Sequence, residues 1–178
     1  MRERLIELLK QLSYRRMRVV LASGRESDFY VDGKQTTLHA EGAWLVGNLV
    51  LDALNPEVLG VGGMVIGADP IASATAAVSW SRGHPVHAFL VRKESKGHGT
   101  GKYVEGRGNL PNGTPVCIVE DTTTTGASML QAVDRVEAEG LRVVQCLTIV
   151  DREEGAEEAL AARGLALTRL VRRHELEA

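Results

Sequence analysis

Apolar and polar residues alternate along the chain with two different periods, and each period predicts a different kind of element. Apolar positions recur at helical spacing in five segments, so helices are expected over residues 2–12, 40–54, 69–81, 127–139 and 153–163. Short apolar runs bounded by turn residues predict strands over residues 19–21, 29–31, 58–61, 85–91, 115–120, 142–150 and 165–170. Such alternation is typical of βαβ units, so we expect an α/β fold with a mainly parallel central sheet flanked by helices.

Composition and charge narrow the class of protein. With 178 residues, of which 44% are hydrophobic, the chain is expected to form one domain over residues 1–178. A formal net charge of −2 argues against a broad nucleic-acid or membrane surface, and no apolar run approaches the roughly 18 residues that span a bilayer. Cys117 and Cys146 lie in apolar runs without CxxC spacing, which favours buried free thiols over a disulfide or metal pair. Since MRERLIELLK also lacks a signal-peptide core, we expect a cytoplasmic protein.

The segment VCIVEDTTTTGAS, residues 116–128, places two adjacent acids and four consecutive threonines at the end of an expected strand. An apolar strand delivers the carboxylates of Glu120 and Asp121, four threonines follow, and a helix is expected to start near Gly126 or Ala127. The N-terminus of a helix presents free N–H groups to an anion such as phosphate, and threonine hydroxyls add donors. Because the acids would repel phosphate, they suit the hydroxyls of a sugar instead. The segment predicts a ribose 5-phosphate site; the alternative is an ordinary N-cap after a chance threonine run.

A second loop, VGGMVIGADPIASATA at residues 61–76, carries small residues where a strand passes into a helix. Small residues let backbone amides approach a second anion, and Pro70 suits the first turn of a helix. A tight connection in which Asp69 caps the helix is compatible with that interpretation.

A third segment concentrates positive charge in an otherwise acidic protein. Arg92, Lys93, Lys96 and His98 fall within seven positions, and the stretch 93–109 holds five glycines, which predicts a mobile loop or an exposed hairpin. Mobile cations that close over a site would stabilise charge on a leaving group and exclude water. The alternative is a solvated charged loop.

These segments resemble those of a known family. VCIVEDTTTTGAS is similar to the phosphoribosyl-pyrophosphate (PRPP) motif of the type I phosphoribosyltransferases, and VRKESKGHGTGKYVEG resembles the catalytic loop of orotate phosphoribosyltransferases. ASGRESDFYVDGK, residues 22–34, resembles the N-terminal segment of the same enzymes. The resemblance implies a type I phosphoribosyltransferase fold in which about residues 1–35 form part of a small hood over the base site. It also implies transfer of the phosphoribosyl group of PRPP to orotate, giving orotidine 5′-monophosphate and pyrophosphate, in pyrimidine synthesis.

The resemblance assigns roles to residues at matching positions. It places PRPP binding on two segments, comprising Glu120, Asp121, Thr122, Thr123, Thr124, Thr125, Gly126, Ala127, Ser128, Gly67, Ala68 and Asp69. It places catalysis on Lys96, helped by Arg92, Lys93 and His98, and contact with orotate on Thr124, Arg152, Phe29 and Tyr30. The planar donor fork of Arg152 suits the carboxylate of orotate. Mg²⁺ is the implied cofactor, held mainly through PRPP and water, with Asp121 as the one candidate protein ligand.

The resemblance also implies a homodimer in which the catalytic loop reaches the neighbouring subunit's site. Two departures from the family pattern remove expected lysines, because this chain has Ala22 before Ser-Gly-Arg and no lysine near Gly67; Lys34 or the loop cations are the candidates to compensate. Trp44 and Trp80 are interpreted as core or subunit contacts. Two other functions stay open, a phosphoribosyltransferase for a purine or uracil and a non-catalytic PRPP-sensing regulator, although Arg152 and the cationic loop argue against them.

Overall fold

The computed structural model describes residues 1–20, 26–94 and 102–177, and its centre is a six-stranded sheet. The strands follow the order β5-β4-β3-β6-β7-β8. They are β3 (Gly60–Met64), β4 (His87–Val91), β5 (Val104–Glu105), β6 (Pro115–Thr123), β7 (Arg142–Asp151) and β8 (Leu167–Arg172). All neighbours pair in parallel except β4 and β5. The mainly parallel α/β sheet expected from the sequence is confirmed.

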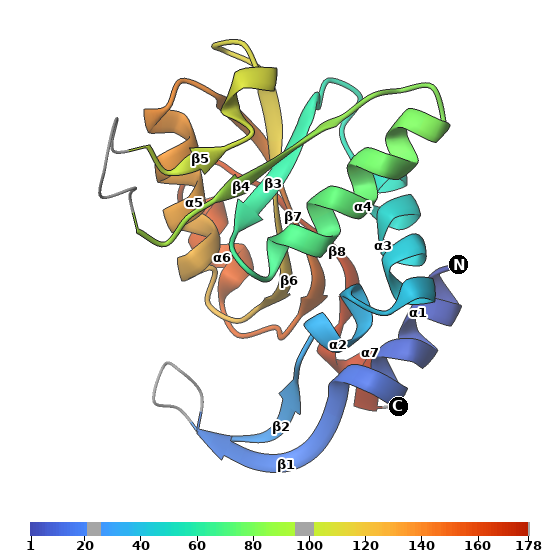
Figure 1. Ribbon diagram of the computed structural model, residues 1–178. Coiled ribbons are helices and arrows are strands. Elements are labelled where there is room, and N and C mark those ends of the chain that lie inside the picture. Colours follow the sequence, from blue (N-terminus) through green and yellow to red (C-terminus); the bar gives the residue numbers. More distant parts are fainter. Residues whose placement is uncertain (21–25, 95–101, 178) are drawn as a thin grey trace.

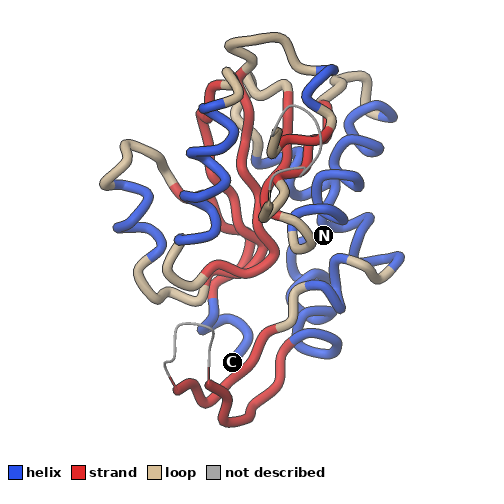
Figure 2. The backbone as a smooth tube through the Cα atoms, turned by 60° about the vertical axis from the view of Figure 1, so that its left-hand side comes forward, coloured by secondary structure: helices blue, strands red, loops and turns tan. Residues whose placement is uncertain are grey.

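Helices cover both faces of this sheet (Figures 1 and 2). One face carries α1 (Arg2–Leu8), α3 (Ala40–Ala53) and α4 (Ala68–Ser81), and the other carries α5 (Ala127–Ala138) and α6 (Ala156–Ala161). Side chains alternate between the faces along β6: Cys117 and Val119 join one buried cluster, whereas Val116 and Ile118 join the other. The central strand is therefore buried on both sides, which explains its continuous apolar run.

The N-terminal region adds a hairpin outside the main sheet. Helix α1 continues as a π-helix, η1 (Leu9–Ser13), and leads into β1 (Tyr14–Val20), which pairs antiparallel with β2 (Glu26–Val31). The hairpin and the following helix α2 (Lys34–Thr37) lie below the sheet in Figure 1. Both strands are longer than the sequence pattern predicted, and α2 was not expected. Residues 21–25, which include the Ser-Gly-Arg motif and Ala22, lie outside the described residues.

The segment expected to be a mobile loop or hairpin contains regular structure on its C-terminal side. Strand β5 pairs with the end of β4, and a 3₁₀-helix, η2 (Arg107–Asn109), follows it. The Arg92 N–H donates to the Tyr103 carbonyl at 2.8 Å, which extends the pairing toward the loop. These contacts fit an exposed hairpin at its base, while residues 95–101 lie outside the described part. A last short helix, α7 (Arg173–Glu177), was also not expected.

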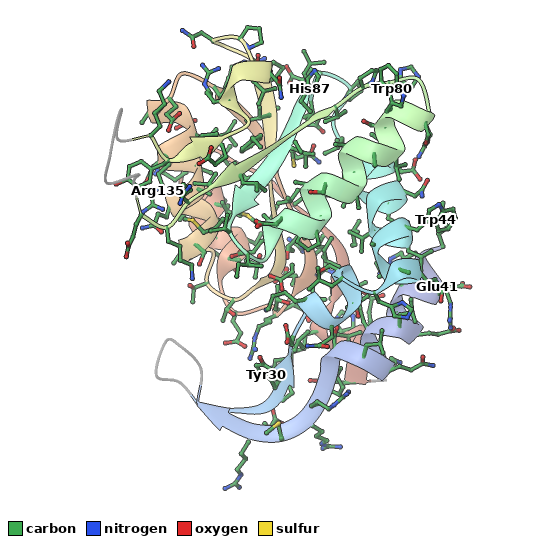
Figure 3. All side chains as sticks on the ribbon, viewed as in Figure 1. Tyr30, Glu41, Trp44, Trp80, His87 and Arg135 are labelled. Atoms are coloured by element: carbon green, nitrogen blue, oxygen red, sulfur yellow. The ribbon has the colours of Figure 1, made fainter. Side chains whose placement is uncertain are left out.

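Several expectations about single side chains can be compared with this fold. Cys117 and Cys146 are free and buried, as expected. Trp44 and Trp80 are 57% and 76% exposed on α3 and α4, so their interpretation as core residues is wrong (Figure 3). In the described ranges, none of the helices combines the length and apolarity needed to cross a bilayer.

Candidate active site

One cavity of about 470 Å³ opens where β3 and β6 end. Four segments distant in sequence line it: α2, the loop after β3, the start of the cationic loop, and the β6–α5 connection. Its lining residues are Lys34, Met64, Val65, Ile66, Gly67, Lys93, Glu120, Asp121 and Ser128. The three segments that the sequence singled out for an anionic sugar therefore meet at one place, as expected for ligands of a parallel sheet.

The two acids of β6 leave the strand on opposite faces and still reach the same cavity, because they lie near its carboxyl end. The Thr123 hydroxyl donates to Glu120 Oε2 at 2.9 Å. Burial raises the pKa of Glu120 to about 7, because the charged form loses its hydration. Burial also raises the pKa of Asp121, and the nearby Lys34 ammonium opposes that rise. The site therefore holds two carboxyl groups in water-poor surroundings with one cation close by.

The Asp121 side chain packs closely against two glycines from different segments. A Cβ atom built on Gly67 would lie 2.5 Å from Asp121 Oδ1, and one built on Gly33 would lie 2.9 Å from Asp121 Oδ2. Gly67 has φ −61°, an ordinary helical value, so close approach rather than backbone freedom requires glycine there. The Asp121 carboxylate thus touches both the α2 segment and the loop that follows β3.

The start of α5 presents uncapped N–H groups. Its N-cap is Gly126, with φ 78°, and no described side chain hydrogen-bonds the first turn of the helix. The threonines before Gly126 therefore do not serve as an ordinary N-cap of α5. Ser128 in the first turn lines the cavity. Within the described part of the chain, no group hydrogen-bonds the buried Thr122 Oγ1. These unsatisfied donors suit an anionic ligand.

Helix α4, which follows the loop after β3, begins at Ala68, one residue earlier than the sequence predicted. The N-cap of α4 is Gly67, so the expectation that Asp69 caps the helix is wrong. Asp69 lies in the first turn, and burial raises its pKa. Among the described residues, its buried Oδ1 has no hydrogen-bond partner, which leaves an acceptor available beside the loop. The peptide bond between Val65 and Ile66 in this loop is cis.

The cationic loop enters the site through its first residues. Lys93 lines the cavity, whereas the Arg92 guanidinium pairs with Glu105 at 2.8 Å. Arg135 of α5 holds both stems of the loop: its Nη1 donates to the Arg92 carbonyl at 2.6 Å, and its guanidinium lies 4.4 Å from the ring centroid of Tyr103 (Figure 3). Lys96 and His98, the other expected catalytic residues, lie outside the described residues.

The residues expected to contact orotate are not part of the cavity lining. Phe29 is buried between two guanidinium groups, with Arg152 at 4.2 Å and Arg173 at 3.9 Å from its ring centroid. Arg152 is itself 3% exposed, and its Nε donates to Glu154 at 3.0 Å. Tyr30 is 41% exposed on the hairpin (Figure 3). Arg152 and Phe29 are thus brought together, although they are 123 positions apart in the chain.

Lys34, which the sequence offered together with the loop cations as a candidate to compensate for the missing lysines, lies in the cavity. Its Nζ is 2.7 Å from Asp32 Oδ1 and 3.6 Å from Asp121 Oδ2. The hydrogen bond to Asp32 raises the pKa of Lys34, so the ammonium stays charged at neutral pH. A signal was present in the sequence, because Lys34 is the only lysine or arginine between Arg25 and Arg82.

Comparison with known proteins agrees over nearly the whole chain. Residues 62–165 match the family described as "Phosphoribosyl transferase domain". The orotate phosphoribosyltransferase of Sorangium cellulosum is 47% identical over 176 residues, covering 98% of this chain and 92% of that protein. The enzyme of the same name from Nostoc sp. is 44% identical over 165 residues, covering 93% and 80%. The crystal structure of Mycobacterium tuberculosis orotate phosphoribosyltransferase in complex with PRPP has a TM-score of 0.79 and 38% identity, and the match covers 99% of both chains.

Proposed function

The chain belongs to the orotate phosphoribosyltransferases, and from this membership we propose how its residues carry out the reaction. These enzymes transfer the phosphoribosyl group of PRPP to N1 of orotate and release orotidine 5′-monophosphate and pyrophosphate, a step of pyrimidine nucleotide synthesis. One observation carries the assignment of residues: a single cavity gathers the acids of β6, the start of α5, the loop after β3 and Lys93. Each of these parts matches one part of PRPP in charge and donor type.

We assign the ribose and its 5-phosphate to the β6–α5 connection. Glu120 and Asp121 accept hydrogen bonds from the ribose hydroxyls, and the turn from Thr122 to Ser128, including Gly126 and Ala127, donates to the phosphate. The uncapped N–H groups of α5 and the unpaired Thr122 hydroxyl support this division. Acids and donors thus serve different parts of one ligand.

We assign the pyrophosphate to the loop after β3, where backbone groups of Gly67, Ala68 and Asp69 face it. The catalytic loop supplies Lys96, assisted by Arg92, Lys93 and His98, which neutralise the departing pyrophosphate. The transition state resembles a ribosyl oxocarbenium ion, in which bond breaking runs ahead of attack by the orotate N1 anion. Positioning and electrostatics then account for catalysis, and no strong protein base is required.

We assign orotate to the hairpin side of the site, with Arg152 on its carboxylate and Thr124, Phe29 and Tyr30 around the pyrimidine. The Nε of Arg152 donates to Glu154 at 3.0 Å, so orotate would approach a guanidinium that already has one carboxylate partner. The Arg152 guanidinium lies 4.2 Å from the centroid of the Phe29 ring, and its planar donor fork suits paired hydrogen bonds to a carboxylate.

Mg²⁺ is the cofactor we propose, and the donor set of the cavity fits it. Mg²⁺ prefers oxygen ligands and keeps several waters, and in phosphate-binding sites the protein contributes one or two carboxylates. Asp121, with Glu120 beside it, is the protein contribution here, and no described group of three or more His, Cys, Asp or Glu side chains forms a fuller cage. When bound, the ion would neutralise pyrophosphate charge; the chain's own residues orient PRPP against it.

We further propose a cytoplasmic homodimer that shares catalytic loops, with each chain acting as one domain and residues 1–35 contributing to the hood. The exposed Trp44 and Trp80 on α3 and α4 support a subunit contact, since large aromatic side chains are enriched in interfaces. The free buried thiols support a reducing compartment.

Pyrophosphate release from PRPP and Mg²⁺, measured with orotate, uracil and purine bases in turn, tests the proposal. Release with orotate alone is expected, and release with another base at an equal rate would contradict it. Lys96→Ala should depress kcat strongly while PRPP still binds, and near-normal turnover would refute the loop assignment. Asp121→Asn should raise the KM for PRPP, and an unchanged KM would count against the ribose role.

A further inference from the structure

We propose that Lys34 is a PRPP-binding residue whose ammonium contacts the pyrophosphate group, in place of the cations that this chain lacks at Ala22 and Gly67. The inference rests on the proposed function, because it assigns one more residue to the same cavity. It singles out Lys34 of α2 from the candidates that the sequence left open, which also included the loop cations.

The position of Lys34 is the first support. Lys34 lines the cavity together with Gly67 and Asp121, and its Nζ lies 3.6 Å from Asp121 Oδ2. The backbone that carries it is fixed from two sides. The Lys34 N–H donates to Asp32 Oδ1 at 3.2 Å, and the preceding Gly33 packs directly on the Asp121 side chain. The side chain itself is 41% exposed, so its ammonium can redirect toward a ligand while its backbone stays in place.

The charge of the cavity is the second support. PRPP carries several negative charges, and the cavity wall already includes the acids Glu120 and Asp121. The loop at residues 61–76 contains no lysine or arginine, so it offers the pyrophosphate only neutral donors. Among the described lining residues, the cations are Lys34 and Lys93. Lys34 therefore supplies half of the positive charge that the described wall presents.

The donors of the ammonium are the third support. A lysine ammonium has three N–H groups, and two carboxylates lie near it, that of Asp32 at 2.7 Å and that of Asp121 at 3.6 Å. The longer of these two distances is a weak contact, which a phosphate oxygen can replace. An ion pair that is partly open to water contributes little to stability, so redirecting Lys34 from its resting partners carries a small penalty.

The direct test is calorimetric titration of the full-length protein with PRPP and Mg²⁺ in the absence of orotate. Because a charge-assisted hydrogen bond is lost, Lys34→Met should weaken the Kd for PRPP about 10- to 100-fold. Lys34→Arg, which keeps the charge, should recover part of the affinity. Lys10→Met is the matched control, since Lys10 lies in η1 away from the cavity lining, and its Kd should stay within about twofold of the unmodified protein.

Asp32→Asn separates a ligand from a structural partner. If Lys34 binds PRPP, releasing it from Asp32 should leave the Kd unchanged or tighten it, whereas Lys34→Met weakens it. If the Asp32–Lys34 pair only shapes α2, both substitutions should weaken binding together, and that result would overturn the proposal. A Lys34→Met protein with wild-type affinity and an unchanged Tm would overturn it as well. If Lys34→Met does not fold, Asp32→Asn and Lys34→Arg decide the question.

The proposed function fails in a distinguishable way. If the unmodified protein binds PRPP but releases no pyrophosphate with orotate, the assignment of the reaction is wrong, whereas the role of Lys34 is still decided by the calorimetric comparison.

Discussion

Replacing Gly67 with alanine tests the contact on which the geometry of the site depends. Gly67 has helical φ and ψ angles of −61° and −38°, so alanine fits the backbone without strain. The added Cβ would nevertheless lie 2.5 Å from Asp121 Oδ1, and the two atoms must separate by about 0.9 Å to reach an ordinary contact of 3.4 Å. Asp121 is 8% exposed and has Gly33 on its other side, so it has little room to retreat.

The expected magnitude follows from overpacking a buried site. Extra methyl groups in well-packed positions typically lower the free energy of unfolding by about 1–3 kcal/mol. In a chain of this size each kcal/mol shifts the Tm by about 2–4 °C, so we expect a Tm lower by about 2–12 °C. PRPP affinity should fall by about tenfold or more, which corresponds to about 1.4 kcal/mol, because the displaced carboxylate and loop both face the cavity.

Thermal unfolding of the unliganded protein and calorimetric titration with PRPP and Mg²⁺ measure the two effects separately. Gly108→Ala is the matched control, because a Cβ there meets nothing within 4 Å and the backbone is not in the left-handed region. That substitution should be neutral or slightly stabilising, since alanine restricts the unfolded chain. A Gly67→Ala protein that matches Gly108→Ala in both Tm and PRPP affinity would refute the contact argument.

Three further predictions follow from single contacts. Burial raises the pKa of Glu120 from 4.5 to about 7, so the stability contributed by its neutral carboxyl is fully present below about pH 4.5 and is lost as the pH rises through 7. Glutamine imitates the neutral carboxyl at every pH, so in thermal unfolding scans Glu120→Gln should raise the Tm over that of the unmodified protein more at pH 8 than at pH 5. An equal difference at both pH values would contradict this. Arg135→Leu removes the hydrogen bond to the Arg92 carbonyl and the contact with the Tyr103 ring, so kcat should fall about tenfold with little change in the Kd for PRPP. Steady-state kinetics that show full turnover would contradict a role of Arg135 in positioning the cationic loop. Arg152→Ala should raise the KM for orotate more than tenfold while PRPP affinity, measured by calorimetry, stays within about twofold, and parallel losses for both substrates would place Arg152 outside the orotate site.

The sequence predicted the long elements well because their burial pattern is periodic. The apolar run over 115–120 and the helix over 127–139 correspond to β6 and α5 within a few residues. The missed elements are short: α2, β5 and α7 have between two and five residues, too few to repeat a period. The widening of the first helix into a π-helix over Leu9–Ser13 has no signature in the spacing of its leucines.

The candidate site was predictable where its polar side chains lie at the end of a strand. Glu120, Asp121 and Ser128 reach the cavity because β6 and α5 carry them there. Contacts between distant segments were not predictable. The Phe29 ring lies between Arg152 and Arg173, and this arrangement depends on how the hairpin and the C-terminal helix meet, which no local pattern encodes.

The position of Asp121 between Gly33 and Gly67 links three positions whose side-chain sizes must be chosen together. A larger residue at 33 or 67 meets the Asp121 side chain, so it is better tolerated where residue 121 becomes smaller. Mutagenesis libraries that vary one of these positions at a time will therefore record losses of stability or PRPP affinity at each of them. Active variants with a reshaped PRPP site are expected where position 121 is varied together with position 33 or 67.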